Sequence, residues 1–138
     1  MFVRDPMARV LSAYNDKFVK DNKYFHRTYG RVIIKRYRPN PTKQALETGS
    51  GVTFPEFTKH LVETRMRDEH WQAFDKLCHP CAVNYDFMGR FENLYEEADH
   101  LIKKVGIEDR VSSHAFHWSY TATDMLHYYS LIPKERIL

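Results

Sequence analysis

The first fourteen residues constrain the fold of this 138-residue chain more than any other part of it. An apolar step, Phe2-Val3, precedes Asp5, a good helix N-cap, and Pro6, which suits the first helical position. Apolar residues at helical spacing then continue to Phe18 and predict a helix. Because a lone strand cannot pair its own backbone groups, residues 2–4 need neighbouring strands. The opening therefore predicts a strand-to-helix turn and an α/β fold.

Two further helices have clear boundaries in the sequence. Thr53 and Glu56 stand at capping-box spacing and begin a helix in residues 53–67. The apolar face predicted for this helix consists of Phe54, Phe57, Leu61 and Val62. Residues 92–106 form the clearest pattern, with acids in the first turns, lysines in the last and Gly106 as the stop.

The remaining segments have weaker patterns. Residues 31–37 are rich in β-branched side chains and predict a strand or extended segment, and residues 85–91 alternate like a buried strand with Tyr85 and Asp86 in structural roles. Residues 38–51 contain two prolines and two glycines and read as a loop. Residues 123–138 predict a helix, a break at Pro133 and the start of another helix. We expect one domain, mostly helical, with a few short strands.

Charge and hydropathy restrict the partners and the location. The net charge is +3, with eight histidines that add charge below about pH 6.5, which suits an anionic ligand. Basic residues are scattered and no nucleic-acid motif occurs, so we expect no nucleic-acid partner. No apolar run reaches the length of a membrane span and no signal peptide is evident. A complete chain of this kind would be cytosolic.

The two cysteines, Cys78 and Cys81, form the motif "CHPC". This spacing fits half a zinc site, a redox pair or a tight disulfide. A structural zinc site needs four ligands and no second CxxC exists, while a thioredoxin-type pair needs a strand-to-helix setting. A structural role, as a disulfide or as buried thiols, is favoured, and we expect no metal.

The segment "RDPMARVLS" carries groups suited to a phosphate. Arg4 precedes the helix and Ser12 lies about two turns along it, roughly 10 Å from the cap. A guanidinium that folds back over this face would present a fork of donors beside the hydroxyl. Asp5 serves the helix cap. Serines on helices are more often surface or packing residues, so these residues alone indicate a phosphate site only weakly.

The wider stretch "FVRDPMARVLSAYNDKF" resembles the 3′-phosphate-binding segment of sulfotransferases that use 3′-phosphoadenylyl sulfate (PAPS). It is most similar to the Golgi carbohydrate sulfotransferases of the HNK-1 and chondroitin/dermatan 4-O group. A second stretch, "DEHWQAFDKLCHPCAVNYDFMGRFENL", fits the same group, as do "TFPEF" and "HYYSLIPKE". The resemblance covers nearly the whole chain. It implies a partial P-loop-like sulfotransferase fold.

The resemblance also implies a donor site and a missing portion. The cofactor segment comprises Arg4, Asp5, Pro6, Met7, Ala8, Arg9, Val10, Leu11 and Ser12. By family likeness, Arg4 and Ser12 contact the 3′-phosphate of PAPS directly. Met7 and Ala8 depart from the usual Phe and Glu, and Met7 is expected to pack as an adaptable apolar residue. The family's upstream 5′-phosphosulfate segment, anchor and stem are not seen, so we expect a C-terminal portion of a longer enzyme.

His70 is the candidate base, because its His-Trp pair belongs to the family signature and histidine titrates near neutrality. The alternatives are a core histidine with a fixed hydrogen bond, which is the more common role, and a residue that contacts the substrate. Trp71 would stack on a sugar or pack in the core. Arg65, Arg67 and Arg90 are candidates to face an acidic glycan, although surface arginines are usually solvated.

The activity implied by the resemblance is sulfuryl transfer from PAPS to a hydroxyl of a glycan. The acceptor would be N-acetylgalactosamine of chondroitin or dermatan, or a uronic acid. The alternative is an inactive or regulatory remnant that keeps the fold or the 3′-phosphoadenosine contact. The implied location is the lumenal side of the Golgi membrane, with membrane association only through an N-terminal anchor. In that oxidising lumen, Cys78 and Cys81 would be disulfide-bonded, with each other or with partners elsewhere.

Overall fold

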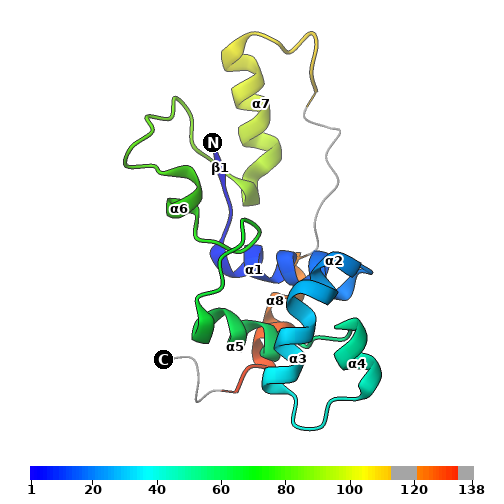
Figure 1. Ribbon diagram of the computed structural model, residues 1–138. Helices are drawn as coiled ribbons and strands as arrows, with labels where there is room; N and C mark the ends of the chain where they lie inside the picture. Colours follow the sequence, from blue (N-terminus) through cyan, green and yellow to red (C-terminus); the bar gives the residue numbers. More distant parts are fainter. Residues whose placement is uncertain (113–120, 134–138) are drawn as a thin grey trace.

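A computed structural model describes residues 1–112 and 121–133 of the chain (Figure 1). Helices dominate it, and the described strands are β1 (Phe2–Val3) and β2 (Gly89–Arg90). The longer helices are α1 (Pro6–Tyr14), α3 (Arg31–Tyr37), α4 (Lys43–Thr48), α5 (Phe54–Thr64), α7 (Leu94–Val105) and α8 (Thr121–Ser130). The shorter elements are the π-helices η1 (Asn15–Val19) and η2 (His26–Gly30), α2 (Lys23–Phe25), α6 (Phe74–Cys78) and the 3-10 turn η3 (Phe91–Asn93).

The opening turn forms as the sequence predicts. Asp5 is the N-cap of α1, where its Oδ1 accepts a hydrogen bond from the Ala8 backbone N–H at 2.8 Å, and Pro6 takes the first helical position. α1 runs directly into η1, so the helical path reaches Val19. Leu11 and Tyr14 are buried on its inner face.

The predicted sheet partner of the opening strand is β2, which pairs with β1 in parallel. Phe2 aligns with Gly89 and Val3 with Arg90. A Cβ on Gly89 would lie 2.6 Å from the Phe2 ring, so a larger residue there would displace that ring. The strand in residues 85–91 is shorter than predicted, because only Gly89 and Arg90 pair with β1.

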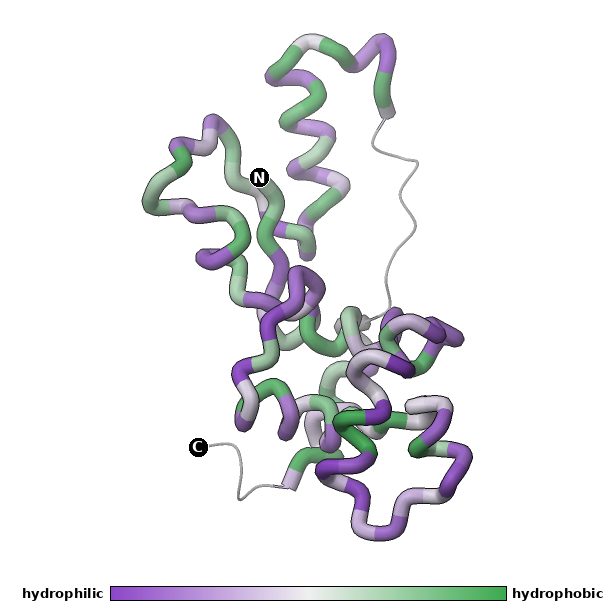
Figure 2. Tube along the Cα trace, viewed as in Figure 1, coloured by the Kyte–Doolittle hydropathy of each residue, from purple (hydrophilic) through white to green (hydrophobic). Residues whose placement is uncertain are grey.

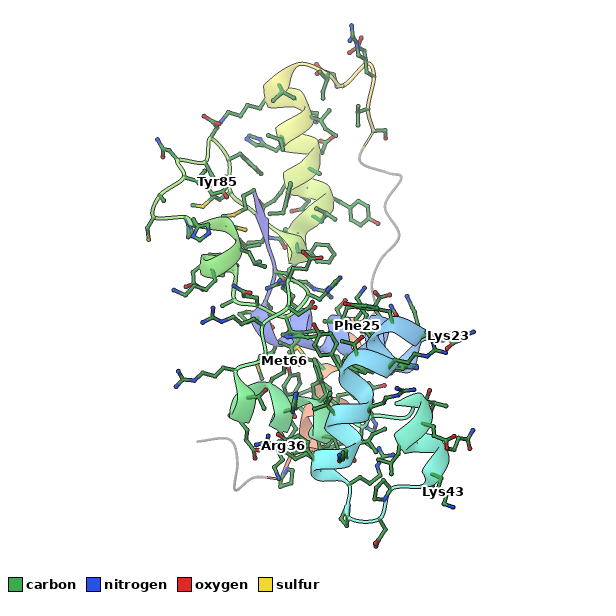
Figure 3. The ribbon with its side chains drawn as sticks, in the orientation of Figure 1. Lys23, Phe25, Arg36, Lys43, Met66 and Tyr85 are labelled. Atoms are coloured by element: carbon green, nitrogen blue, oxygen red, sulfur yellow. The ribbon has the colours of Figure 1, made fainter. Side chains whose placement is uncertain are left out.

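A cluster of aromatic and aliphatic side chains forms the core. Its buried members come from residues 11–71. They are Leu11, Ala13, Tyr14, Phe18, Phe25, Ile33, Ile34, Val52, Phe54, Phe57 and Trp71. Figure 3 shows Phe25 among the side chains where α1 and α2 meet, while Lys23 extends outward. Tyr128 and Tyr129 of α8 pack against the same cluster, each in a T-shaped contact with the Phe54 ring.

The strand or extended segment expected over residues 31–37 is wrong, because these residues form α3. The helical path continues from η2 into α3 without a break. Ile33 and Ile34 are fully buried in the core, and the burial of large aliphatic side chains outweighs the small helix penalty of β-branching.

The segment 38–51 is only partly the loop that its prolines and glycines predict. It contains α4, whose N-cap Thr42 accepts a hydrogen bond from the Ala45 backbone N–H at 3.2 Å. α4 ends at Gly49, which has a left-handed φ of 75°. Gly49 also lies against the backbone of Gly30. A Cβ added to Gly30 would lie 2.1 Å from the Gly49 carbonyl oxygen. Two glycines therefore let α4 dock on η2.

The predicted capping box at Thr53 and Glu56 is confirmed, with both of its hydrogen bonds present at the start of α5. Phe54 and Phe57 are buried as expected, but Val62 is 77% exposed and was wrongly placed on the apolar face. The helix predicted in residues 92–106 is confirmed as α7, which ends at Gly106 with φ 67°. Figure 2 shows apolar and polar residues alternating around α7.

The C-terminal helix is confirmed as α8, while the further helix expected after Pro133 lies outside the described residues. Cys78 and Cys81 are free thiols, the first half-buried and the second exposed. The expected disulfide therefore does not join these two residues, and they are not buried thiols. In residues 1–112 and 121–133, no helix is both long and apolar enough to span a membrane.

Candidate functional site

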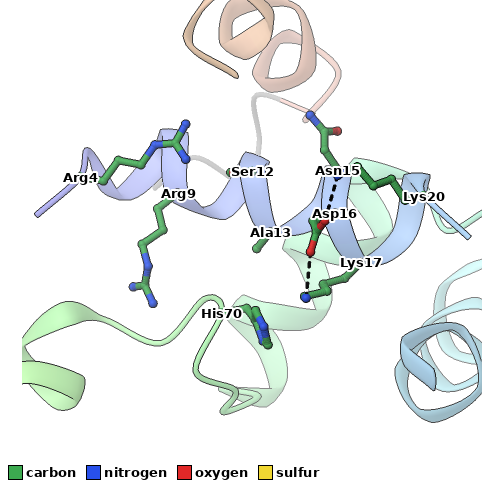
Figure 4. Close-up of a pocket in the computed structure, with 9 residues that line it drawn as sticks. All are labelled: Arg4, Arg9, Ser12, Ala13, Asn15, Asp16, Lys17, Lys20 and His70. Carbon is green, nitrogen blue, oxygen red and sulfur yellow. Dashed lines mark hydrogen bonds and ion pairs between the residues drawn. The ribbon is translucent and has the colours of Figure 1, made fainter. Parts of the chain in front are cut away.

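A pocket of about 360 Å³ follows one side of α1 and η1 (Figure 4). Its lining residues come mostly from residues 4–20, and His70 joins them from the loop after α5. They are Arg4, Arg9, Ser12, Ala13, Asn15, Asp16, Lys17, Lys20 and His70. The structure thus brings the two predicted phosphate contacts, Arg4 and Ser12, to the same pocket as the predicted base.

The pocket is cationic, because four basic side chains line it and Asp16 is the one acid among its described lining residues. Asp16 Oδ2 lies 2.8 Å from Lys17 Nζ, and Asp16 Oδ1 lies 3.0 Å from Lys20 Nζ. Both ion pairs are hydrogen-bonded and lower the pKa of Asp16, and the pair with Lys17 has the larger effect. One carboxylate cannot offset four cations, so the pocket attracts anions.

Arg4 is held by an aromatic ring at the entrance to α1. Its guanidinium carbon lies 4.6 Å from the centre of the Phe91 ring. Burial lowers the pKa of Arg4 although Glu92 and Asp5 act in the opposite sense, yet an arginine stays charged at neutral pH. In Figure 4 its side chain extends along α1 in the direction of Ser12. That this guanidinium folds back over the helix onto a ligand beside Ser12 stays a prediction.

Arg9 leaves α1 in a different direction and reaches the loop that carries His70 (Figure 4). Its Nη2 donates to the Glu69 carbonyl at 2.6 Å, and its Nη1 donates to the Gln72 carbonyl. These carbonyls flank His70 in sequence. Arg9 therefore fastens the His70 loop to the pocket-lining helix.

The other members of the predicted cofactor segment do not line the pocket. Asp5 and Pro6 start the helix, Ala8 and Leu11 are buried, Val10 packs against the core, and Met7 is 48% exposed rather than packed. The Met7 carbonyl accepts a hydrogen bond from Tyr129 at 2.9 Å. Within Arg4–Ser12, the side chains available to a ligand are thus Arg4, Arg9 and Ser12.

His70 combines a fixed hydrogen bond with access to the pocket. Its Nδ1 lies 2.6 Å from Asp68 Oδ1, its side chain is 34% exposed, and its ring meets the Phe25 ring edge-to-face at 5.4 Å. A core histidine would be enclosed by the protein. His70 instead is partly exposed and lines the pocket beside α1.

Sequence reasoning missed Asp68 and Tyr29, which stand behind His70. The Tyr29 hydroxyl donates to Asp68 Oδ2 at 3.2 Å. The carboxylate two residues before His70 was a readable signal, since an aspartate can hydrogen-bond two residues on. Tyr29 is 39 residues away, and no local pattern links it to the loop.

Trp71 packs in the core, because it is buried and its Nε1–H donates to the Met66 carbonyl at 3.2 Å. Arg65, Arg67 and Arg90 are exposed and lie outside the pocket lining. Tyr85 has the expected structural hydrogen bond, its hydroxyl donating to the Cys78 carbonyl at 2.7 Å. Across the part of the chain that the structure describes, no three His, Cys, Asp or Glu side chains are placed to share a metal ion.

Asn15 adds an unusual polar atom to the pocket. Its Oδ1 is buried and has no hydrogen-bond partner among the described residues. An unpaired buried acceptor costs roughly 1–3 kcal/mol.

Comparison with known proteins gives the family. Residues 1–136 match the model of the sulfotransferase family. The chain is 48% identical over 109 residues to human carbohydrate sulfotransferase 9, covering 77% of this chain and 25% of the relative. It is 41% identical over 142 residues to carbohydrate sulfotransferase 14 of Danio rerio, covering 100% of this chain and 38% of the relative. It is 38% identical over 130 residues to carbohydrate sulfotransferase 11 of Rattus norvegicus (90% and 37%).

The chain therefore spans between a quarter and two fifths of these relatives. No solved structure matches it. The expected family resemblance is confirmed by the family match and by relatives over most of the chain, and the mostly helical fold with a few short strands agrees with it. The chain belongs to the sulfotransferase family.

Proposed function

We propose that this chain is part of a carbohydrate sulfotransferase that moves a sulfuryl group from PAPS to a glycan hydroxyl. In this proposal the pocket along α1 holds the 3′-phosphate end of the donor. The observation that supports it best is that Arg4 and Ser12 line the same cationic pocket. The relatives are named carbohydrate sulfotransferases, which supports a glycan as acceptor and a partial P-loop-like sulfotransferase domain as the fold.

The chemistry of the pocket fits a nucleotide phosphate. A guanidinium presents several N–H donors in a plane that matches phosphate oxygens, and a serine hydroxyl adds one more donor. Lys17 and Lys20 extend the positive charge beyond Ser12. Cations and a hydroxyl donor of this kind suit the 3′-phosphate of 3′-phosphoadenosine.

His70 is the proposed base for the acceptor hydroxyl. PAPS, when bound, supplies an activated sulfuryl group on its 5′-phosphate. As the acceptor oxygen bonds to sulfur and the bond from sulfur to the phosphate oxygen breaks, the hydroxyl proton passes to His70 Nε2. A positioned base contributes about 10²- to 10⁴-fold to such a step.

The proposal extends to the acceptor and to location. Arg65 and Arg67 are exposed just before Asp68 and could meet the acidic groups of a glycosaminoglycan. Arg90 is exposed on β2 and is the third candidate. The acceptors proposed are N-acetylgalactosamine of chondroitin or dermatan, or a uronic acid. The location proposed is the lumenal side of the Golgi membrane.

The test is transfer of radiolabelled sulfate from PAPS to a panel of desulfated glycans, made with the complete gene product. We expect label in at least one glycan and competition by 3′,5′-diphosphoadenosine. If the nucleotide binds but no glycan is labelled, the chain is an inactive or regulatory remnant. If the nucleotide does not bind and no glycan is labelled, the proposed function is wrong.

A further inference from the structure

We propose that Asp68 is a positioning residue, held in place by Tyr29, that fixes the ring of His70 with one nitrogen toward the pocket. This inference rests on the proposed function, because it concerns how His70 receives a proton. It assigns a role to two residues that do not line the pocket. The contacts that carry it come from η2 and from the loop after α5.

Both oxygens of Asp68 are used. Oδ1 accepts from the His70 backbone N–H at 3.0 Å and from the His70 ring at 2.6 Å. Oδ2 accepts from the Tyr29 hydroxyl at 3.2 Å. The Asp68 side chain is only 14% exposed, so water competes little for these hydrogen bonds. The carboxylate therefore has one orientation, and it sets that of the imidazole.

This geometry defines which ring nitrogen carries the proton. Burial would raise the pKa of Asp68, but hydrogen bonds from His70 and Tyr29 outweigh it and lower that pKa, so Asp68 is ionised at neutral pH. Burial, then the charge of Asp68, raises the pKa of Tyr29, which stays a donor. An ionised carboxylate only accepts hydrogen bonds. The proton of neutral His70 is thus on Nδ1, and the lone pair is on Nε2, where a base needs it.

The loop is also held from the pocket side. Arg9 of α1 donates to the carbonyls of Glu69 and Gln72, on either side of His70. The Phe25 ring lies edge-to-face with the imidazole at 5.4 Å. Helix α1, η2 and the aromatic core thus fix His70 together. A small displacement of a reacting group can cost about 10²-fold in rate, which makes such support valuable to a base.

A turn with only a structural role would need fewer hydrogen bonds. The hydrogen bond from the His70 backbone to Asp68 is enough to close the turn at residues 68–70. The additional bond to the ring, and the second oxygen held by Tyr29, act on the imidazole rather than on the backbone. Since that imidazole is one third exposed in a cationic pocket, the arrangement prepares it for a ligand.

The test compares Asp68→Asn with Asp68→Glu in the complete gene product. Asp68→Asn keeps the shape but allows the amide to donate, which favours the wrong tautomer of His70. We expect about a 10²-fold lower kcat, an unchanged Kd for 3′,5′-diphosphoadenosine, and a smaller loss of kcat in Asp68→Glu. Asp109→Asn is the matched control, because Asp109 is exposed and its nearest cation, Arg110, lies 3.9 Å away at the surface.

A second pair of variants tests the outer hydrogen bond. Tyr29→Phe removes only the hydroxyl that holds Asp68, so we expect a several-fold loss of kcat with the nucleotide Kd unchanged. Tyr24→Phe is its control, since Tyr24 is exposed on α2. Nitrogen-15 NMR of the imidazole gives a direct readout, with Nδ1 protonated in the wild type and the tautomers mixed in Asp68→Asn.

The outcomes separate this inference from the proposed function. If the wild type transfers sulfate and Asp68→Asn turns over equally fast, or if His70 carries its neutral proton on Nε2, the positioning role is wrong and the function stands. If the wild type neither transfers sulfate nor binds the nucleotide, the proposed function fails and this role with it. If Asp68→Asn does not fold, the kcat of Tyr29→Phe and the tautomer of His70 in the wild type decide whether the positioning role is correct.

Discussion

Two regions of the molecule differ sharply in how their apolar residues are used. The aromatic body, residues 6–71 with Met125–Ile132 of the C-terminal part, holds the buried cluster. The arm, residues 73–112, has Ala98 as its buried hydrophobic residue among those described, and many of its large apolar side chains are exposed. These exposed residues are Phe74, Leu77, Val83, Met88, Phe91, Val105, Ile107 and Val111. Figure 1 shows α6 and α7 standing apart from α3, α4 and α5.

The difference bears on the pocket, because one of its lining residues, Arg4, contacts the arm. Ser12, Lys17 and His70 belong to the body. Arg4 lies at the junction, with its guanidinium over Phe91 of the arm and the Asp5 backbone N–H donating to Glu92 at 2.8 Å. A ligand in the pocket would therefore contact residues of the well-packed body directly. It would be linked to the arm through Arg4.

The largest effect expected from this comparison concerns unfolding. Phe57→Ala removes a fully buried ring that packs against Phe18 and Trp71, and should lower the free energy of unfolding by about 3–5 kcal/mol. Phe74→Ala is the control in the arm, where the ring is 45% exposed and its loss should change this free energy by less than about 1 kcal/mol. Urea unfolding followed by circular dichroism measures both.

Equal losses in the two variants would show that the arm is as well packed as the body and would break the comparison. A smaller loss in Phe57→Ala than in Phe74→Ala would reverse it.

A smaller effect is expected from the ion pairs of the two regions. In the body, Arg38 Nε donates to Glu56 Oε1 at 2.9 Å and Arg38 Nη2 to Glu56 Oε2 at 2.6 Å, in a mostly buried pair. Burial would raise the pKa of Glu56, but hydrogen bonds from Arg38 and Thr53 lower it. Glu56→Gln should therefore cost about 1.5–3 kcal/mol of unfolding free energy at pH 7.

The pH dependence follows from the direction of that pKa. Because the folded pKa of Glu56 is below the unfolded value, its stabilisation is complete above about pH 4.5 and is lost as the pH falls through the folded value. Urea unfolding at pH 7 and pH 3 should show the wild type and Glu56→Gln converging in acid. Asp99→Asn, which breaks an exposed pair with Lys103 on α7, should give no resolvable change. A constant difference across pH would refute this role of Glu56.

Local signals in the sequence were enough to predict several elements. These signals act on the nearby backbone of their own helix. Asp5-Pro6 and the capping box at Thr53 and Glu56 begin helices, and Gly106 ends one. Their effect can therefore be predicted without knowledge of the tertiary structure. The segment carrying Arg4 and Ser12 was identified mainly by its resemblance to the sulfotransferase family, since its residues alone indicate a phosphate site only weakly.

The misses depend on contacts between distant residues. Residues 31–37 form a helix because Ile33 and Ile34 enter a core built mostly by other segments. α4 forms where Gly49 meets Gly30, 19 positions earlier. Asp68 and Tyr29 become partners only when η2 lies beside the loop after α5. The resemblance implied a disulfide for the two cysteines, with each other or with partners elsewhere, and the structure shows that they do not join each other.

The central claim is that the pocket along α1 recognises the 3′-phosphate through Arg4 and Ser12. Calorimetric titration of the complete gene product with 3′,5′-diphosphoadenosine and with adenosine 5′-phosphate tests it most directly, in the wild type, Arg4→Ala, Ser12→Ala and the exposed control Arg110→Ala. A charged hydrogen bond of about 1.5–3 kcal/mol predicts a preference of at least roughly 10-fold for the 3′-phosphate, lost in Arg4→Ala, reduced in Ser12→Ala and kept in the control. The same preference in Arg4→Ala as in the wild type would contradict the claim.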